Sequence, residues 1–146
     1  MTASLYQQAV LDHYRNPRNH GEMAGCTHAA DGANPLCGDS LRIELACADG
    51  RIVDMRFSGE ACAVTTAAAS MLSELVSGFD AARIAELEQP FQRLVAGEIA
   101  NDDTLGPLNA FGELRRYPSR RKCALLPWAT LRAALAGTAR ASTESP

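Results

Sequence analysis

Three cysteines and one aspartate have the side-chain chemistry of a metal site: Cys37, Asp39, Cys62 and Cys123. Cys37 and Asp39 lie two positions apart, so in turned or extended backbone both side chains can reach one point. Three thiolates and one carboxylate match the ligand shell of Zn²⁺, and they match the shell of an iron–sulfur cluster equally well. The residue types therefore indicate a shared metal site of either kind.

The spacing of these residues leaves a second interpretation open. The cysteines lie far apart in sequence, unlike the paired Cys-x-x-Cys motifs of a zinc ribbon, so they could also be unrelated buried thiols. The chain has five cysteines, an odd number, which favours metal binding or thiol chemistry over a disulfide framework in a reducing compartment. Of the other two, Cys47 fits the apolar face of a strand, and Cys26 lies in a glycine-flanked loop without an indicated partner.

Two helices are expected to begin at or close to the later cysteines. Cys62 opens a run of small residues that predicts a helix over residues 62–76. Cys123 precedes a second helix, which we expect to start near Leu126 because Pro127 cannot lie deep inside a helix. Unpaired N–H groups at a helix N-terminus carry partial positive charge, so both positions favour the thiolate form.

The first half of the chain predicts strands joined by tight turns. A first strand is expected to start at Thr27. Residues 41–47 and 53–57 alternate apolar and polar side chains on either side of Asp49-Gly50, and Asp-Gly suits a two-residue type I′ hairpin turn. Helical spacing of apolar residues predicts further helices over residues 5–14, 81–88, 91–96 and 108–114. Pro90 can occupy the first turn of the helix over residues 91–96.

Composition limits the classes of function. A chain of 146 residues is long enough for one domain that folds without disulfide bonds. Its formal net charge of −3 argues against nucleic acid as the main partner, and no segment is apolar for long enough to cross a membrane. The first residues lack the charged and apolar regions of a secretory signal. We therefore expect a cytoplasmic protein without a membrane or nucleic-acid partner.

The remaining charged and imidazole side chains have plainer interpretations. His13, His20 and His28 are each interpreted as surface or hydrogen-bonded residues rather than metal ligands. The basic run within residues 115–122 is interpreted as a solvated face, which could also moderate the negative charge of a nearby site of three thiolates and an aspartate. Residues 97–106 are polar and rich in turn formers, so they are expected to be an exposed loop.

Four motifs, taken together, resemble the NifU N-terminal/IscU superfamily across residues 5–137. They are DHYRNPRN at 12–19, NPLCGD at 34–39, FSGEACAV at 57–64 followed by ASML at 69–72, and YPSRRKCAL at 117–125 with Trp128. Two features are similar to the SufU branch of that superfamily. IscU-type scaffolds carry histidine directly before the last cysteine, where this chain has Lys122. The long segment between Cys62 and Cys123 is similar to the insertion that marks SufU proteins.

The resemblance implies an α+β fold of the IscU/SufU type, with a three-stranded antiparallel sheet packed by helices. The domain would span residues 1–137, and the small polar residues 138–146 are expected to form a disordered tail. The resemblance also implies a zinc site made by Cys37, Asp39, Cys62 and Cys123. Cys37 would then be the catalytic residue that accepts sulfur as a persulfide.

Proteins of the SufU type accept sulfur from a PLP-dependent cysteine desulfurase of the SufS type. The resemblance therefore implies a zinc-dependent persulfide acceptor that activates such a desulfurase and relays sulfur to a downstream cluster-assembly scaffold, without completing a turnover by itself. A thiolate bound to zinc is masked as a nucleophile, so Cys37 would leave the metal before it attacks. Two alternatives stay open: an IscU-like scaffold that holds iron or an iron–sulfur cluster at the same ligands, and a structural zinc domain without sulfur chemistry.

Overall fold

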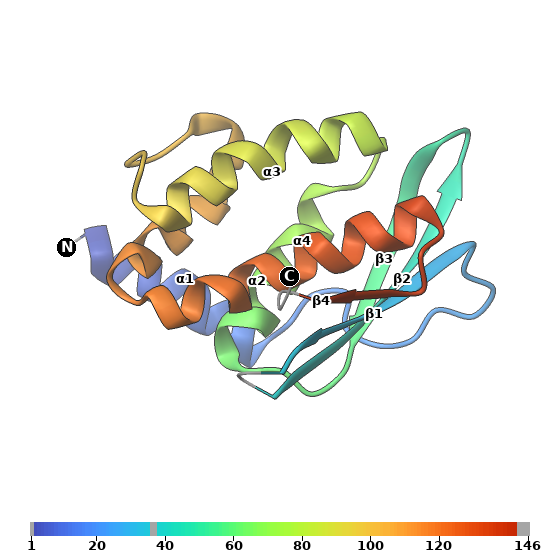
Figure 1. Cartoon of the computed structure of the whole chain (residues 1–146), viewed down its shortest axis with the longest axis horizontal. Helices are drawn as coiled ribbons and strands as arrows, with labels where there is room; N and C mark the ends of the chain where they lie inside the picture. Colours follow the sequence, from blue (N-terminus) through green and yellow to red (C-terminus); the bar gives the residue numbers. More distant parts are fainter. Residues whose placement is uncertain (1, 36–37, 143–146) are drawn as a thin grey trace.

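The computed structural model describes the backbone of residues 2–35 and 38–142 and the side chains of residues 8–35 and 38–142. Helices gather on one side of a twisted sheet (Figure 1), so the expected α+β class is confirmed. The elements, in chain order, are α1 (Thr2–Arg15), β1 (His28–Asn34), β2 (Asp39–Ala48), β3 (Arg51–Ser58), α2 (Ala63–Leu75), α3 (Ala81–Ala96), the 3₁₀ segment η1 (Asp103–Arg116), α4 (Pro118–Ala136) and β4 (Arg140–Ser142).

The sheet has four strands in the order β3-β2-β1-β4. β2 is antiparallel to both β1 and β3, whereas β4 is parallel to β1. The prediction of a three-stranded antiparallel sheet is therefore wrong, because the sheet is mixed and has a fourth strand. β4 also falls within residues 138–146, so the expected disorder does not hold for residues 140–142. Residues 143–146 lie outside the described part of the chain.

The fourth strand forms because the chain reverses direction after α4. Gly137 ends the helix with φ 76°, in the left-handed region that glycine adopts without strain. The Asp31 N–H then donates to the Ala139 carbonyl at 2.9 Å, which brings the following residues against the free edge of β1. So short an edge strand has no apolar alternation that could reveal it in the sequence.

The hairpin between β2 and β3 confirms the turn predicted at Asp49-Gly50. Both residues have positive φ, 54° and 76°, as a type I′ turn requires. A register shift between Ala46 and Cys47 lets Cys47 pair with Ile52. Cys47 is partly buried against the core, at the opposite end of β2 from Asp39. It is a packing residue, as its strand position predicts.

Helices α2 and α4 pack on the sheet, and α1, α3 and η1 pack on these two helices. The alanines at positions 67–69 of α2 are fully buried, so α2 approaches its neighbours closely. Gly32 of β1 allows the same close approach to α4, because a Cβ there would clash with the Thr130 hydroxyl. Among the described helices, none is long and apolar enough to span a bilayer.

Pro90 and Pro127 lie inside continuous helices. The sequence predicts that each proline lies in the first turn of a helix, and both predictions are wrong. A proline inside a helix removes one hydrogen bond and costs about 3 kcal/mol. Aromatic packing offsets this cost: Phe91 and Trp128, each directly after a proline, are fully buried with ring centroids 5.3 Å apart. As a result Cys123 lies in the second turn of α4 and not before its first.

The segment between α3 and α4 is more regular than its composition suggests. The sequence predicts an exposed loop over residues 97–106, but η1 begins at Asp103 and Leu105 is fully buried. Leu108 and Phe111 continue the buried side of η1, which packs against α3. Residues 97–102 form no helix or strand and are mostly exposed, as predicted, whereas the later part of this segment packs on the core.

Candidate metal centre

Three of the four predicted ligands come from different elements and converge at one point. Asp39 is the first residue of β2, Cys62 is the N-cap of α2, and Cys123 lies in the second turn of α4. Their ligand atoms all lie within 4.8 Å of one another. In Figure 1 the start of β2 lies beside the start of α2, which shows how residues far apart in sequence meet.

The fourth predicted ligand, Cys37, lies outside the described residues, as does its neighbour Leu36. Its place in the chain is between Asn34 and Asp39, which pair across β1 and β2. The roles of Cys37 as ligand and as sulfur acceptor therefore stay predictions.

Two hydrogen bonds set the direction of the Asp39 carboxylate, which is only 4% exposed. Oδ1 accepts the Cys62 N–H at 2.8 Å, and Oδ2 accepts the Thr65 hydroxyl at 2.7 Å. Each carboxylate oxygen can accept more than one partner, so either oxygen can still bind a metal ion. Both donors lie at the start of α2, so this end of the helix orients the carboxylate without a metal ion.

The two thiols of the site have different surroundings. Cys62 is partly buried, and its Sγ accepts the Thr65 N–H at 3.5 Å, which confirms the predicted position at a helix N-terminus. Cys123 is fully buried, and the Asn34 side-chain amide donates toward its Sγ at 3.9 Å. The expectation that Cys123 lies just before a helix is wrong, because α4 already begins at Pro118.

The donor set fits a zinc ion. Zinc prefers four ligands in a tetrahedron, at about 2.3 Å for sulfur and about 2.0–2.2 Å for oxygen, which places neighbouring donors about 3.3–3.8 Å apart. Two sulfurs and a carboxylate oxygen within 4.8 Å need only a small contraction to reach that spacing. Asp39, Cys62 and Cys123 could therefore hold a metal ion, and thiolates also suit iron.

The remaining described cysteines do not join the site. The Cys26 thiol donates to Glu44 Oε2 at 3.6 Å, and Cys47 lies at the far end of β2. In the part of the chain that the structure describes, Asp39, Cys62 and Cys123 are the one group of three or more metal-binding side chains. This grouping favours a shared site over the interpretation of unrelated buried cysteines.

Sequence reasoning misses two residues beside the ligands. Thr65 is fully buried. The sequence feature that could have indicated it is its position three residues after the N-cap Cys62, because the backbone N–H at that position donates to the capping side chain. Asn34 is also fully buried, and its Oδ1 has no hydrogen-bond partner among the described residues. Nothing in the sequence pattern distinguishes Asn34 from an ordinary turn asparagine.

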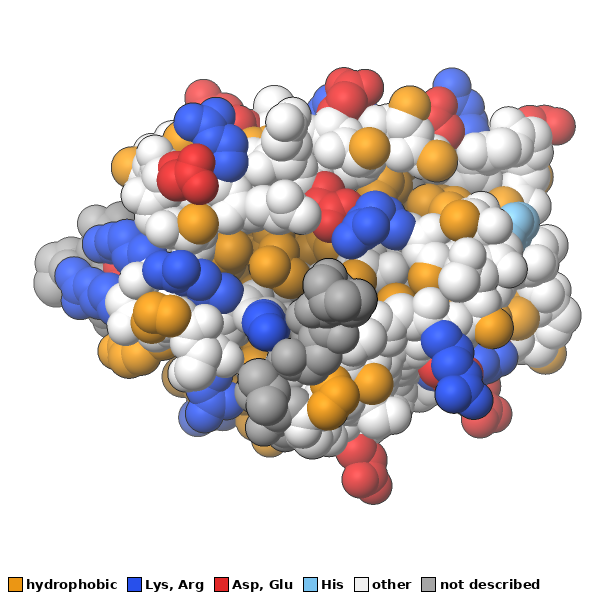
Figure 2. All heavy atoms as spheres, viewed as in Figure 1, with side chains coloured by type: hydrophobic (Ala, Val, Ile, Leu, Met, Phe, Trp, Pro, Cys, Tyr) orange, Lys and Arg blue, Asp and Glu red, His pale blue; other side chains and the backbone are white. Residues whose placement is uncertain are grey.

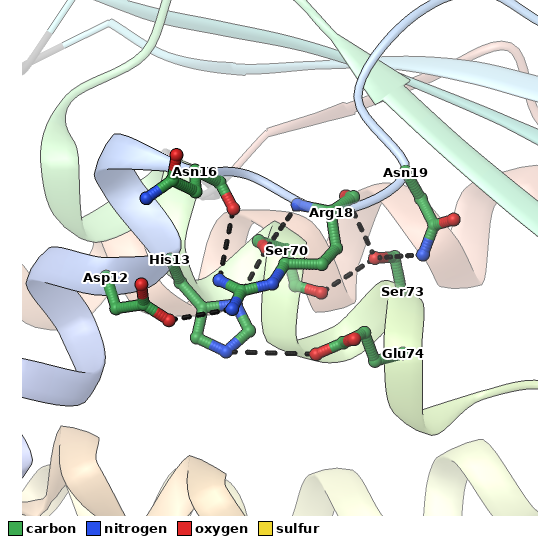
Figure 3. Close-up of polar contacts among 8 residues, drawn as sticks. All are labelled: Asp12, His13, Asn16, Arg18, Asn19, Ser70, Ser73 and Glu74. Carbon is green, nitrogen blue, oxygen red and sulfur yellow. Dashed lines mark hydrogen bonds and ion pairs between the residues drawn. The ribbon is translucent and has the colours of Figure 1, made fainter.

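A second buried polar cluster joins α1 to α2 (Figure 3). His13 Nδ1 lies 2.7 Å from the Ser70 hydroxyl, and that oxygen accepts the Arg18 N–H at 2.9 Å, which leaves the serine proton available to His13. His13 Nε2 lies 3.8 Å from Glu74. Ser70 is fully buried, so this cluster is a structural link and not a nucleophilic site. His13 is a hydrogen-bonded residue, as the sequence predicts.

The pKa of His13 leads to an expected pH dependence of stability. Burial lowers this pKa below its usual value of 6.5, and the Arg18 guanidinium lowers it further, against smaller opposite effects of Glu74 and Asp12. The unfolded chain therefore binds a proton at higher pH than the folded chain. The stability that neutral His13 contributes is complete above about pH 6.5 and is lost as the pH falls through the lowered pKa. Urea unfolding between about pH 7.5 and about pH 5 measures this slope.

His13→Gln provides the comparison, because glutamine does not ionise. We expect this variant to be less stable than the parent at neutral pH, yet to show a flatter dependence on pH over the same range. The pKa of Asp12 is lowered by its hydrogen bond with Arg18, so the contribution of Asp12 is lost only at pH values below that range. Equal slopes in parent and variant would contradict the assignment to His13.

Comparison with known proteins finds relatives along nearly the whole chain. Residues 5–138 match the NifU-like N terminal domain family. The zinc-dependent sulfurtransferase SufU of Bacillus subtilis (strain 168) is 36% identical over 130 residues, which cover 88% of this chain and 87% of the relative. The iron-sulfur cluster assembly scaffold protein IscU of Thermotoga maritima is 30% identical over 131 residues, which cover 90% of this chain and 92% of the relative.

Solved structures have the same fold. A protein from Fervidobacterium islandicum AW-1, proposed as an iron-sulfur cluster assembly scaffold for the SUF system, has a TM-score of 0.83 at 28% identity, covering 92% of this chain and 99% of the other. The N-terminal part of a NifU-like protein from Brucella abortus also has a TM-score of 0.83, at 21% identity, which shows likeness of fold alone. The chain has this fold, brings three candidate ligands together in it and matches the family model from residue 5 to residue 138, so it belongs to the NifU-like N-terminal domain family.

Proposed function

We propose that this protein is a zinc-dependent sulfur acceptor of the SufU type, which takes sulfur as a persulfide from a cysteine desulfurase and passes it into iron–sulfur cluster assembly. The observation that carries the proposal is the convergence of Asp39, Cys62 and Cys123 within 4.8 Å, in a chain 36% identical to a zinc-dependent sulfurtransferase. Lys122 stands directly before Cys123, where IscU-type scaffolds carry histidine. This residue supports the SufU branch over the IscU branch.

The ligand residues have separate parts in the proposed sulfur transfer. A bound zinc ion would keep its thiol ligands deprotonated. Cys37 is the nucleophile: its thiolate attacks the terminal sulfur of a cysteine persulfide on the desulfurase, the sulfur–sulfur bond of the donor breaks, and the donor cysteine leaves as a thiolate. Cys62 and Cys123 are the retained ligands, and Asp39 is the hard, exchangeable one. The product is a persulfide on Cys37, from which a downstream scaffold takes the sulfur.

The surface beside the ligands supports docking of a PLP-dependent desulfurase of the SufS type. A groove of about 560 Å³ lies between α1, the first turn of α2, η1 and the start of α4. Its apolar lining is Val10, Leu11, Val64, Ala110, Phe111, Leu114 and Tyr117. Val64 is two residues from Cys62, so the groove adjoins the ligands, and Arg120 and Glu113 complete its lining. Lys and Arg side chains gather at the left of Figure 2, over the region where η1 leads into α4. A partner with apolar and acidic side chains would fit this surface.

A scaffold of the IscU type is the second candidate. The same ligands could hold iron or an iron–sulfur cluster, and the relative from Thermotoga maritima is named as such a scaffold. The two functions differ in what the site holds at rest. The acceptor holds zinc without sulfide, whereas the scaffold holds iron with sulfide.

Metal and labile-sulfide content per chain tests the proposal on protein purified without added metal. We expect about one zinc per chain and no sulfide, with Cys47→Ala, a cysteine away from the ligands, as a matched control that keeps the zinc. Iron with labile sulfide would instead support the scaffold, and a protein without any metal would contradict both functions. Zinc without persulfide on Cys37, after incubation with a desulfurase and cysteine, would leave only a structural zinc domain.

A further inference from the structure

The Thr65 hydroxyl contacts each of the three described ligand residues. Its oxygen lies 2.7 Å from Asp39 Oδ2, 3.1 Å from the Cys123 carbonyl oxygen and 3.4 Å from Cys62 Sγ. The Thr65 backbone N–H also donates to Cys62 Sγ at 3.5 Å. The residue is fully buried, so water does not compete for these contacts. One side chain thus joins β2, α2 and α4 at the candidate metal centre.

The hydroxyl has a single proton for these neighbours. The shortest contact, to Asp39 Oδ2, is the hydrogen bond that a carboxylate acceptor favours. Asp39 Oδ1 accepts the Cys62 N–H at 2.8 Å, so both carboxylate oxygens are hydrogen-bonded to groups at the start of α2. Removing the hydroxyl leaves Oδ2 without its buried donor, so the Asp39 carboxylate would be held through Oδ1 alone.

The contact with Cys123 depends on Pro127. In a regular helix the Cys123 carbonyl would accept the N–H of residue 127, but proline has none. That carbonyl therefore does not accept an N–H from residue 127, and the Thr65 hydroxyl can share its one proton between Asp39 Oδ2 and this carbonyl as a three-centre hydrogen bond. The proline inside α4, which has no part in the proposed sulfur chemistry, opens an acceptor next to a ligand.

This arrangement differs from the usual behaviour of a buried helical threonine. Such residues commonly donate to the carbonyl four residues earlier in their own helix. Thr130 does this, donating to the Leu126 carbonyl at 2.8 Å. Thr65 is the third residue of α2, so its own helix has no residue four positions earlier. Thr65 instead directs its hydroxyl out of α2, toward the ligands.

We propose that Thr65 is a positioning residue that holds Asp39, Cys62 and Cys123 in the arrangement a metal ion requires. The inference rests on the proposed metal site and assigns that site a residue that binds no metal itself. Hydrogen-bond partners of ligating carboxylates orient them, and their loss typically weakens metal binding about 10- to 100-fold. Each ligand residue also has a partner of its own, namely the Cys62 N–H for Asp39, the Thr65 N–H for Cys62 and the Asn34 amide for Cys123, and the Thr65 hydroxyl is the group that contacts all three.

The test compares Thr65→Val, Thr65→Ser and Thr130→Val with the parent in the full chain. Thr65→Val keeps the shape and removes the hydroxyl, Thr65→Ser restores it, and Thr130→Val removes an equally buried hydroxyl away from the ligands. Zinc affinity is measured by competition with a chromophoric chelator. The absorption spectrum of the cobalt-substituted protein reports ligand geometry. Thermal unfolding of the metal-free proteins reports folding.

We expect Thr65→Val to bind zinc about 10- to 100-fold more weakly than the parent and to show an altered cobalt spectrum. Thr65→Ser and Thr130→Val should keep the parent's affinity and spectrum, whatever their melting temperatures. Parent-like zinc affinity in Thr65→Val, or equal losses in both valine variants, would overturn the positioning role while leaving the metal site standing. A parent protein that binds no zinc would overturn the proposed function, and the role of Thr65 with it.

Discussion

Replacing Cys37 with alanine should abolish the stimulation of a cysteine desulfurase by this protein. Alanine has no sulfur that could attack the donor persulfide, and no other thiol of the site is a ready substitute. Cys123 is fully buried, and the Cys62 sulfur is held by the first turn of α2. The assay measures the rate at which the desulfurase releases free alanine from cysteine, with and without this protein or its variant. The rate with Cys37→Ala should equal that of the desulfurase alone.

Two comparisons separate loss of the acceptor from other causes. Cys37→Asp keeps a carboxylate that can bind metal but has no sulfur, so it should be as inactive as Cys37→Ala. Cys26→Ala and Cys47→Ala remove thiols away from the ligands and should stimulate like the parent. Circular dichroism checks that all four variants are folded. Undiminished stimulation by Cys37→Ala would remove Cys37 from the mechanism.

Replacing Cys62 with serine should remove the bound zinc and the stability that zinc adds. Serine is itself a favoured N-cap, so α2 keeps its cap. The free energy of unfolding of the metal-free protein should therefore change by less than about 1 kcal/mol. Zinc adds about 4 kcal/mol to the free energy of unfolding when its free concentration is a thousand times the dissociation constant. A neutral hydroxyl is a much poorer zinc ligand than a thiolate, so this increment should disappear.

Thermal unfolding with and without added zinc measures both quantities on the same samples. Cys26→Ser is the matched control, because it makes the same chemical change at a cysteine that contacts Glu44 rather than the ligands. It should keep the full zinc-induced rise in Tm. An equal rise in Cys62→Ser would show that zinc binds without this thiol and would contradict the ligand set.

Patterns of residues close in sequence are enough to predict much of the fold. Asp49-Gly50 between two alternating segments predicts the hairpin, and the structure has positive φ at both residues. The small-residue run after Cys62 predicts α2, with that cysteine at its N-terminus. These predictions succeed because turn chemistry, strand alternation and helix capping depend on residues close in sequence. The candidate ligands could be named for a similar reason, since thiolates and carboxylates are defined by residue type.

Local patterns gave wrong predictions at three places where contacts between distant residues decide the structure. The local preference of Pro90 and Pro127 indicates that a helix starts at each of them. The packing of Phe91 on Trp128 instead keeps both helices continuous. β4 has no strand pattern of its own and exists because the edge of β1 is available to it. Local preference is a few kcal/mol at most, so burial in the core can outweigh it.

Residue types and short-range patterns are enough to identify the side chains that could bind a metal and the short elements that carry them. The meeting of Asp39, Cys62 and Cys123, and the place of the Thr65 hydroxyl among them, follow from packing between elements far apart in the chain. The physical reason is that ligand chemistry belongs to single side chains, whereas a site within 4.8 Å requires three elements to pack in one arrangement. That arrangement is set by the shared core of sheet and helices, which no local pattern encodes.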